Sequence, residues 1–450
     1  MGRRACQWCP VKPLPGARAR PDAPLDSGAV KILVIGSGAR EHAIVHALAQ
    51  EPDAHELHAA PGNPGIAQQA VLHDVVATDG AAVTALALRL DADLVVVGPE
   101  APLVAGVADA LAEAGIPVFG PTAEAARLEG SKAFAKEVMA AAGVPTALAH
   151  VCTTLDEVAA ALDAFGAPYV VKDDGLAAGK GVVVTEDRDA ALAHAEAALA
   201  ARGDDGRVVV EEYLDGPEVS LFCICDGASV VPLAPAQDFK RAHDGDAGPN
   251  TGGMGAYSPL PWAPAGLTAE VVERIAQPTV DEMARRGTPF SGVLYVGLAL
   301  TSRGTRVVEF NARFGDPETQ VVLSRLTTPL SVVLRAAAGR SLADLPALAW
   351  SDDAAVTVVV AAHGYPGDVR SGDPITGVEA AEELEGVHVL HAGTRLDAGG
   401  SLVSSGGRVL SVVGQGADLA AARERAYAGV AAIDLPGSHH RGDIAAAAAE

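Results

Sequence analysis

Aromatic residues are scarce in this chain of 450 residues, at 4% of the sequence, although apolar residues of all kinds make up 49%. Buried cores must therefore be built from Val, Leu, Ile and Ala. The length suggests about three domains of ordinary size. The 49 Gly and 29 Pro are spread among periodic segments, which indicates many tight turns in a folded chain and argues against disorder.

Basic residues are also few, since 33 Lys and Arg face 57 Asp and Glu, for a formal net charge of −24. Nucleic acids and anionic membranes need basic patches, so we expect neither as a partner. No apolar run approaches the roughly 18–20 residues of a membrane span. Residues 1–29 lack the continuous apolar segment of a signal peptide, and we interpret them as a flexible extension of a cytoplasmic protein.

Cysteine is rare, with five residues. Cys6 and Cys9 form a single C-x-x-C without a second pair, whereas a structural zinc site usually needs four ligands. Cys223 and Cys225 alternate in SLFCICDG, which predicts that both lie on one face of a strand. No disulfide framework is indicated, as is typical of a reducing compartment.

Short apolar strands alternate with helical segments in the first third of the chain. KILVIGSGAREHAIVHALAQ predicts a strand, a turn at Gly36 and Gly38, and a helix from Arg40. This rhythm continues and predicts a doubly wound α/β domain whose binding loops gather at the carboxyl ends of parallel strands. A dinucleotide-dependent dehydrogenase is disfavoured, because the third glycine of G-x-G-x-x-G falls at Glu41.

VVKDDGLAAGKGVVV has the glycines of a phosphate-binding loop without the form of a Walker A motif. Only three residues separate Gly175 from Gly179, a glycine follows Lys180 where a hydroxyl is needed, and valines follow instead of a helix. We predict a hairpin whose glycine loop covers a triphosphate, with Lys172 able to reach a phosphate and Asp173 facing away. A plain flexible hairpin is the alternative interpretation.

A second signal for phosphate chemistry is VVEFNARFGDPETQ. Glu309 and Asn311 alternate on a strand and face the same way, while Phe310 points into the core. Their hard oxygen ligands suit Mg²⁺ held jointly with phosphates, and Arg313 suits a transferring phosphoryl group. A solvated edge strand is the alternative.

Four further segments carry expectations about structure. VVVEEYLDGPEVS predicts a strand whose backbone reads an adenine edge, or simply an ordinary strand and turn. SKAFAKEVMAAAG predicts a helix that begins after Ser131 and ends at Gly143. GPNTGGMGAYSP predicts a long irregular loop, and the strand-rich C-terminal stretch predicts a separate α+β module.

Together these pieces resemble the ATP-grasp superfamily. The blocks VIGSGAREHA, PGNPG, GPEAPLVAGVADAL, SKAFAKEVM, KDDGLAAGKGV, QDFKR, DGDAGPNTGGMGAYSP, EFNARFGDPETQ and SSGGRVL occur in this order. Over about residues 31–443 they resemble the phosphoribosylamine–glycine ligase (glycinamide ribonucleotide synthetase) family of purine biosynthesis. The resemblance implies a doubly wound N-terminal domain at 30–130, an ATP-grasp domain of two α+β subdomains at 131–328, and a small C-terminal α+β domain at 350–450.

The resemblance also implies a reaction, in which ATP, glycine and 5-phosphoribosylamine give glycinamide ribonucleotide, ADP and phosphate through glycyl phosphate. We expect a monomer acting on these small molecules. Another ATP-grasp carboxylate–amine ligase or a purine-pathway carboxylase is an alternative, against which GPNTGGMGAYSP argues. A catalytically silent ATP-binding protein is a second, against which the retained Glu309, Asn311, Lys172 and Lys180 argue.

Site residues are carried over motif by motif from the resemblance. The residues expected to bind ATP are Lys172, Gly175, Leu176, Gly179, Lys180, Gly181, Glu211, Glu212, Tyr213, Leu214 and Glu218. Those expected to bind Mg²⁺ or Mn²⁺ are Glu309 and Asn311. Those expected to act in catalysis are Arg313, Asp316, Asp238 and Lys240. Those expected to bind glycine or phosphoribosylamine are Gly36, Gly38, Arg40, Glu41, Arg241, Asn250, Thr251, Gly252, Gly253 and Met254.

The sequence departs from the family pattern at three places. Asp173 stands where the family's flap usually has Ala, and Phe239 stands where many relatives have His. The GLAL segment at 297–300 lacks the additional acidic metal ligand of many ATP-grasp enzymes. Metal affinity is therefore expected to depend on Glu309, Asn311 and ATP itself.

Overall fold

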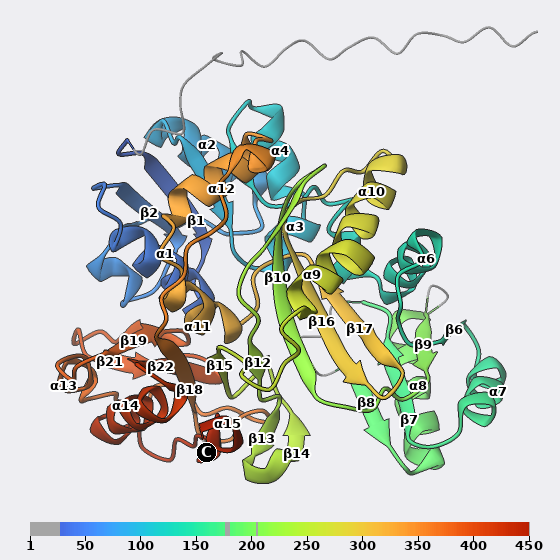
Figure 1. The fold of residues 1–450 in the computed structure, drawn as a ribbon. Coiled ribbons are helices and arrows are strands. Elements are labelled where there is room, and N and C mark those ends of the chain that lie inside the picture. The colour runs from blue at the N-terminus through green and yellow to red at the C-terminus, as the bar shows by residue number, and fades with distance from the viewer. Residues whose placement is uncertain (1–27, 176–180, 204–205, 450) are drawn as a thin grey trace, which may run out of the picture.

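The computed structural model describes residues 28–175, 181–203 and 206–449 (Figure 1). The first and last parts of the chain, blue and red in Figure 1, lie next to each other, and the green and yellow middle part extends away from them. Most of the expected extension at 1–29 lies outside the described residues, as do Leu176, Gly179 and Lys180 of the glycine loop. Within the described ranges, no helix is both long and apolar enough to cross a membrane.

The N-terminal part is the predicted doubly wound unit. Its sheet has the order β3-β2-β1-β4-β5, and every neighbouring pair is parallel. Both faces of β1 are buried in apolar clusters, which explains its unbroken apolar run. The strand order reverses at β1, so a ligand is expected near the carboxyl ends of β1 and β4. The elements are β1 (Lys31–Gly36), α1 (Ala39–Ala49), β2 (Glu56–Pro61), β3 (Val71–Leu72), α2 (Gly80–Leu90), β4 (Leu94–Val97), α3 (Glu100–Val104), α4 (Val107–Glu113) and β5 (Val118–Phe119).

The middle of the chain forms two antiparallel sheets, as expected for two α+β subdomains. One has the order β6-β9-β7-β8, and its apolar core includes residues of α7 and α8; the other has the order β11-β10-β16-β17. The elements up to β9 are α5 (Arg127–Gly130), α6 (Lys132–Ala142), β6 (Ala149–Cys152), α7 (Leu155–Phe165), β7 (Tyr169–Asp173), β8 (Val182–Thr185), α8 (Arg188–Arg202) and β9 (Val208–Glu211). Those that follow are β10 (Glu218–Asp226), β11 (Val230–Pro232), α9 (Leu267–Val271), α10 (Gln277–Arg285), β16 (Ser291–Thr301), β17 (Gly304–Asn311), α11 (Glu318–Arg325) and α12 (Leu330–Ala338).

Several local predictions are confirmed here. β7 and β8 form the hairpin around the glycine loop, with Lys172 opposite Val182. The Ser131 side chain caps α6 by accepting a hydrogen bond from the Phe134 N–H, and Gly143 ends that helix with a φ of 67°. Cys223 and Cys225 lie in one apolar cluster, while the alternating neighbours Phe222 and Ile224 of β10 lie in another.

The C-terminal sheet corrects two expectations, because its order is β12-β15-β18-β22-β19 and its first two strands come from the middle of the chain. GPNTGGMGAYSP is therefore not one irregular loop, since it contains the end of β14 and all of β15, and the C-terminal module is not separate. The elements are β12 (Gln237–Asp238), β13 (Arg241–His243), β14 (Ala247–Asn250), β15 (Gly255–Ser258), β18 (Ala354–Ala361), α13 (Val378–Glu382), β19 (Val387–His391), β20 (Thr394–Leu396), β21 (Leu402–Ser404), β22 (Arg408–Gly416), α14 (Leu419–Ala432) and α15 (Ala446–Ala449). Pairing of β15 with β18 joins the expected substrate loop to the C-terminal sheet.

Candidate active site

Lys172, near the end of β7, is buried and points at Glu211 on β9. Its Nζ lies 2.8 Å from Glu211 Oε2 and donates to the Val308 carbonyl oxygen at 3.1 Å. Lys136 of α6 approaches the other Glu211 oxygen at 3.0 Å. Burial lowers the pKa of Lys172, but Glu211 and Glu309 outweigh it, and the net shift is upward. The lysine therefore keeps the positive charge that a phosphate ligand needs.

The predicted adenine segment begins at the end of β9. Its first two carboxylates are both held by protein groups, Glu211 by the two lysines and Glu212 by the Leu148 N–H at 3.0 Å and Arg303 Nη2 at 2.8 Å. Tyr213, which follows, is 47% exposed. The two carboxylates are thus committed to protein partners, which leaves the backbone of 211–214 and the exposed Tyr213 side chain to contact a base.

Asp173 faces the opposite way from Lys172, as predicted. Its carboxylate accepts from Arg202 Nε of α8 at 2.8 Å. The same guanidinium lies over Gly175, where an added Cβ would come within 2.0 Å of Arg202 Nη2, and where φ is +156°. Gly175 is thus required by the base of the loop itself, whatever the loop binds, and Asp173 adds no charge on the side of Lys172.

Glu218 at the start of β10, Asp238 at the end of β12 and Lys240 just after β12 form a second charged group. Lys240 forms a close ion pair with Glu218, and its Nζ lies 3.8 Å from Asp238 Oδ1. Burial raises the pKa of Asp238 to about 7, with Lys240 opposing the shift and Glu318 and Glu218 adding to it. A carboxyl group that titrates near neutrality is suited to proton transfer.

The predicted metal pair lies on β17 as expected. Phe310 is buried in an apolar cluster, and its neighbours Glu309 and Asn311 are only partly buried. Neither side chain has a hydrogen-bond or ion-pair partner among the described residues. Within the described ranges both side chains thus keep their oxygen atoms available, in keeping with a site that is completed by a ligand.

Arg313 follows directly and is held by two acids from the N-terminal half. Its Nη2 lies 2.9 Å from Glu129 Oε1 of α5, and its Nε lies 3.3 Å from Glu100 Oε2 of α3. Burial raises the pKa of Glu129 despite the attraction of Arg313. The second Glu129 oxygen accepts from the Ala312 N–H at 2.8 Å. These contacts fix Arg313 at the junction between the doubly wound sheet and β17.

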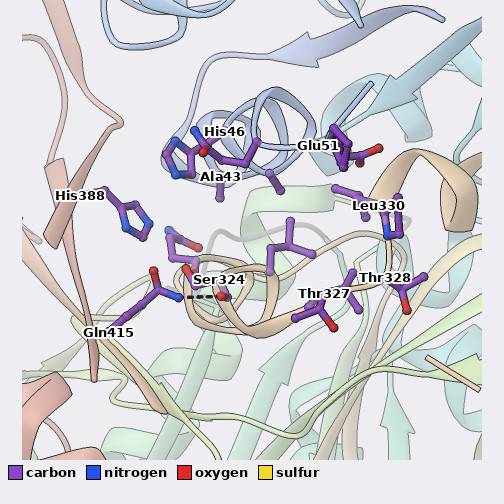
Figure 2. A pocket seen from close by; sticks show the side chains of 16 residues that line it. Ala43, His46, Glu51, Ser324, Thr327, Thr328, Leu330, His388 and Gln415 are labelled. Atoms are coloured by element: carbon purple, nitrogen blue, oxygen red, sulfur yellow. Dashed lines mark hydrogen bonds between the residues drawn. The ribbon is translucent and has the colours of Figure 1, made fainter. Parts of the chain in front are cut away.

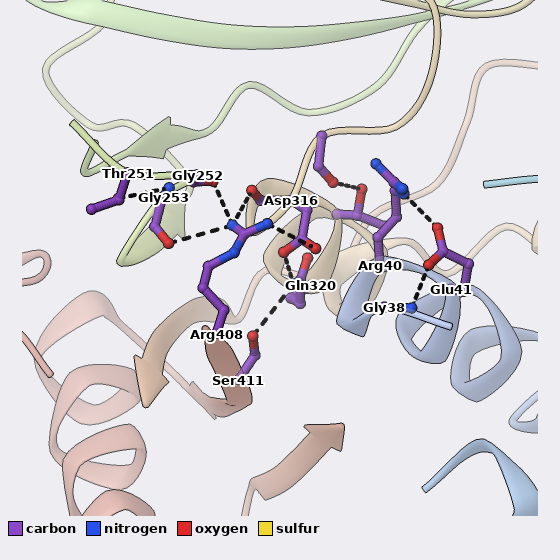
Figure 3. A network of polar contacts seen from close by, with 12 residues as sticks. Gly38, Arg40, Glu41, Thr251, Gly252, Gly253, Asp316, Gln320, Arg408 and Ser411 are labelled. Atoms are coloured by element: carbon purple, nitrogen blue, oxygen red, sulfur yellow. Dashed lines mark hydrogen bonds and ion pairs between the residues drawn. The ribbon is translucent and has the colours of Figure 1, made fainter. Parts of the chain in front are cut away.

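Asp316 joins this junction to the C-terminal sheet (Figure 3). Its Oδ2 lies 3.3 Å from Arg408 Nη2 of β22, and its Oδ1 accepts from Gln320 Nε2 at 2.8 Å. Arg408 Nη1 also donates to the carbonyl oxygens of Asp316 at 2.7 Å, of Gly253 at 3.4 Å and, in a short contact, of Gly252. One guanidinium thus holds the expected substrate loop and the Asp316 loop together.

The glycine turn after β1 is built around Glu41. This residue is 1% exposed, and its carboxylate accepts from the Gly38 N–H and from Arg40 Nε, each at 2.6 Å (Figure 3). A Cβ at Gly98 would meet Glu41 Oε1 at 2.1 Å, and one at Gly36 would meet Glu41 Cγ at 2.5 Å. Glu41 therefore fills the space between the ends of β1 and β4. Because Glu41 is buried, it orients Arg40 through their hydrogen bond and does not itself face a ligand. Arg40 Nη1 donates in turn to the Phe314 carbonyl oxygen at 3.2 Å.

The remaining predicted substrate residues lie on the β13–β14 hairpin and the loop after it. Arg241 pairs with Asn250 across the hairpin and donates to the Gly248 carbonyl at 2.8 Å. Thr251 Oγ1 donates to the Lys240 carbonyl at 2.8 Å. Met254 is fully buried, so it anchors the loop from below.

Some residues of this site were not predicted from the sequence. They are Glu100, Glu129, Lys136, Ser220, Tyr295, Glu318 and Arg408. Glu318 is buried and accepts from Ser220 Oγ at 3.0 Å, while Tyr295 OH lies 2.8 Å from the same Ser220 oxygen. Four of them lie inside blocks that carry the family resemblance, namely Glu100, Lys136, Glu318 and Arg408, and this position was the signal that could have found them.

Three family descriptions together cover most of the chain. Residues 30–129 match the phosphoribosylglycinamide synthetase N domain, 130–319 its ATP-grasp (A) domain, and 355–447 its C domain. The chain belongs to the phosphoribosylglycinamide synthetase family. Lys172, Glu309 and Asp316 all lie in the range matched by the ATP-grasp domain, and Arg408 of the C domain contacts Asp316.

Individual relatives of this family agree. The chain is 70% identical over 422 residues to the phosphoribosylamine–glycine ligase of Streptomyces coelicolor, covering 93% of this chain and 100% of that one. It resembles the crystal structure of phosphoribosylamine–glycine ligase from Thermotoga maritima with a TM-score of 0.78 at 32% identity, covering 92% and 100% of the two chains. The biotin carboxylase domain of a Hydrogenobacter thermophilus 2-oxoglutarate carboxylase, solved with MgADP, shares the fold with a TM-score of 0.67 at 17% identity, covering 91% of each chain.

Proposed function

We propose that this chain joins glycine to 5-phosphoribosylamine at the expense of ATP, giving glycinamide ribonucleotide, ADP and phosphate in purine biosynthesis. The observation that carries the proposal is the meeting of three domains at residues 309–316. This short segment bears the metal pair, the clamped Arg313 and Asp316, which Arg408 holds from the C domain. The 70% identical relative is a phosphoribosylamine–glycine ligase by name, which supports the same ligation here.

The chemistry requires charge neutralisation rather than a protein nucleophile. A glycine carboxylate oxygen bonds to the γ-phosphorus of ATP as the bond to ADP breaks, giving glycyl phosphate. The phosphoribosylamine nitrogen then bonds to the glycyl carbonyl carbon, the C–O bond to phosphate breaks, and the nitrogen loses a proton. We assign Lys172 and the glycine loop to the ATP phosphates, Arg313 to the transferring phosphoryl group, and Asp238 to that proton.

Divalent metal use is a property of ATP-grasp enzymes, and the residues here fit it. Glu309 and Asn311 offer two hard oxygen ligands that no described residue occupies. The described ranges contain no group of three His, Cys, Asp or Glu suited to a metal ion. The other ligands are therefore expected to be triphosphate oxygens and water, which suits Mg²⁺ or Mn²⁺. When bound, the ion neutralises phosphate charge.

The glycine turn and the 250–254 loop are assigned to the substrates. Arg40 lies above the buried Glu41 at the switch point of the doubly wound sheet, where a phosphate-bearing ligand is expected. The loop at 250–254 is held to Asp316 by Arg408, so glycine and the reacting phosphates would meet between them.

A substrate-omission assay tests the function. ADP release is expected only when ATP, glycine and freshly made phosphoribosylamine are all present, and omission of any one should reduce it to background. Bicarbonate in place of glycine should give no turnover. Turnover with bicarbonate would contradict the proposal and favour a carboxylase of the same fold.

We also propose that the protein is a cytoplasmic monomer. The three cysteines in the described ranges are free and buried, as suits a reducing compartment. Sedimentation velocity of the full chain at micromolar concentration should give one species at 45.4 kDa. A dimer would contradict the monomer without affecting the proposed reaction.

A further inference from the structure

Tyr365 reaches the proposed substrate loop from the C domain. It lies in the turn that follows β18, and its hydroxyl oxygen accepts a hydrogen bond from the Gly252 N–H at 2.9 Å. Arg408 Nη1 donates to the Gly252 carbonyl oxygen in a short contact (Figure 3). The C domain thus holds Gly252 at both of its backbone polar groups.

The two glycines in the middle of the loop use their N–H groups inside the protein. The Gly252 N–H is taken by Tyr365, and the Gly253 N–H donates to Thr251 Oγ1 at 3.0 Å. Successive N–H groups of a glycine-rich loop can bind an anion, but these two are already paired. The loop therefore meets a ligand as a preformed surface, and its shape depends on the groups that hold it.

Both ends of the loop are anchored to the backbone that follows β12. The Thr251 N–H donates to the Lys240 carbonyl oxygen at 2.8 Å, and the Met254 N–H donates to the Phe239 carbonyl oxygen at 2.8 Å. Loss of the Tyr365 hydroxyl would leave these two anchors in place and loosen only the glycines between them.

The middle of the loop packs against the segment that carries Asp316. Gly253 has a φ of +108°, and an added Cβ would meet Pro317 Cδ at 2.4 Å and the Asp316 carbonyl oxygen at 3.3 Å. The helix α11 that follows this segment borders a pocket of about 350 Å³ on the side of α1, so its packing there is incomplete (Figure 2). The place of Asp316 relative to the loop therefore depends on the contacts that the C domain makes on the other side.

The ring of Tyr365 is seated by its own domain. A Cβ at Gly407 would meet Tyr365 Cδ2 at 2.3 Å, so the absence of a side chain there leaves room for the ring. The Tyr365 N–H donates to the Ala362 carbonyl oxygen at 3.2 Å, and the Ala362 N–H donates to the Gly407 carbonyl oxygen at 2.8 Å. Gly407 and Arg408, neighbours in the SSGGRVL block, thus place the two groups that hold Gly252.

We propose that Tyr365 is a positioning residue of the proposed active site, which keeps the 250–254 loop in the shape that receives glycine. This inference rests on the proposed function. Without the hydroxyl, glycine would have to order residues 252 and 253 as it binds, and that cost reduces its affinity. Once glycine is bound the loop regains its shape, so the rate at saturation is preserved.

Tyr365→Phe removes one oxygen atom and keeps the ring on Gly407. In the full chain, the KM for glycine should rise about fivefold, the size expected for one hydrogen bond between neutral groups. The values of kcat and of the KM for ATP should change by less than about twofold, because ordering of the loop affects glycine binding alone. An equal KM for glycine in parent and variant would overturn the proposal, as would a fall in kcat alone.

Tyr427→Phe is the matched control in the same domain. The Tyr427 hydroxyl also bonds to backbone groups, since it donates to the Arg441 carbonyl oxygen at 2.7 Å and accepts from the Ile444 N–H at 3.1 Å. Its removal should lower the urea concentration at the midpoint of unfolding and leave the KM for glycine unchanged. An equal rise of that KM in both variants would show that the effect is one of general stability, and the proposal would fail.

Amide hydrogen exchange tests the contact without turnover. In the ligand-free full chain, the Gly252 N–H should exchange about fivefold faster in Tyr365→Phe than in the parent, because its acceptor is gone. An unchanged exchange rate would refute the hydrogen bond and the proposal with it. A parent chain that releases no ADP with all three substrates present would refute the proposed function, whereas an active parent with an unchanged KM in the variant would refute only the role of Tyr365.

Discussion

At the scale of single residues, the ion pairs that Glu129 and Glu100 form with Arg313 can be tested directly. Glu129→Gln keeps an oxygen that can accept from the Ala312 N–H but removes the charge that faces Arg313 Nη2 at 2.9 Å. We expect the fold to persist and turnover to fall by about 10²-fold, because a misplaced cation stabilises the transferring phosphoryl group poorly. Steady-state ADP release, with circular dichroism to verify folding, measures this.

The matched control is Glu124→Gln in the same neighbourhood. Glu124 pairs with Arg127 at the exposed surface, where an ion pair contributes little, and its loss should leave the rate unchanged. Equal rates for the two variants would show that Arg313 needs no clamp. The shared face of Glu309 and Asn311 could be predicted from the sequence because side chains alternate along a strand, whereas their role as metal ligands stays a prediction. Glu129 was not predicted because 183 residues separate it from Ala312, and only tertiary packing brings them together.

At the scale of elements, β22 delivers Arg408 to two loops of the ATP-grasp domain. Arg408→Ala leaves the Asp316 carboxylate and the Gly252 and Gly253 carbonyls without their shared donor, at a cost of about 1–3 kcal/mol. We expect kcat/KM for glycine to fall roughly 10²-fold as the loops move apart. Arg395→Ala on β20, an exposed arginine of the same domain, should behave like the parent chain. An unchanged KM in Arg408→Ala would contradict the assignment of the 250–254 loop to glycine.

Helices and strands that are determined by neighbouring residues could be predicted from the sequence, whereas strands that depend on pairing with distant residues could not. The β1–α1 turn, the β7–β8 hairpin and the capped α6 are specified by neighbouring residues and were predicted. β12 has two residues and pairs with β15, whereas β15 has four residues in a glycine-rich segment and pairs in turn with β18, about a hundred positions later. Such strands carry no periodic pattern of their own, so pairing alone creates them.

At the scale of the whole molecule, the N and C domains meet through histidines that are neutral when packed. His42 accepts from the His391 N–H at 2.8 Å, and burial lowers the pKa of His391 to about 4 and that of His42 well below its usual value. In the unfolded chain these groups take up protons near pH 6.5. The contribution of these histidines to the free energy of unfolding is therefore fully present above that pH. It decreases as the pH falls below 6.5, by about 1.4 kcal/mol per pH unit for each histidine that stays neutral in the folded chain.

The urea concentration at the midpoint of unfolding should decrease when the pH is lowered from 7.5 to 5.5. His391→Asn should make this decrease smaller, whereas His440→Asn at an exposed position should leave it unchanged. A midpoint equally sensitive to pH in all three proteins would show that the domain contact is not what acid weakens.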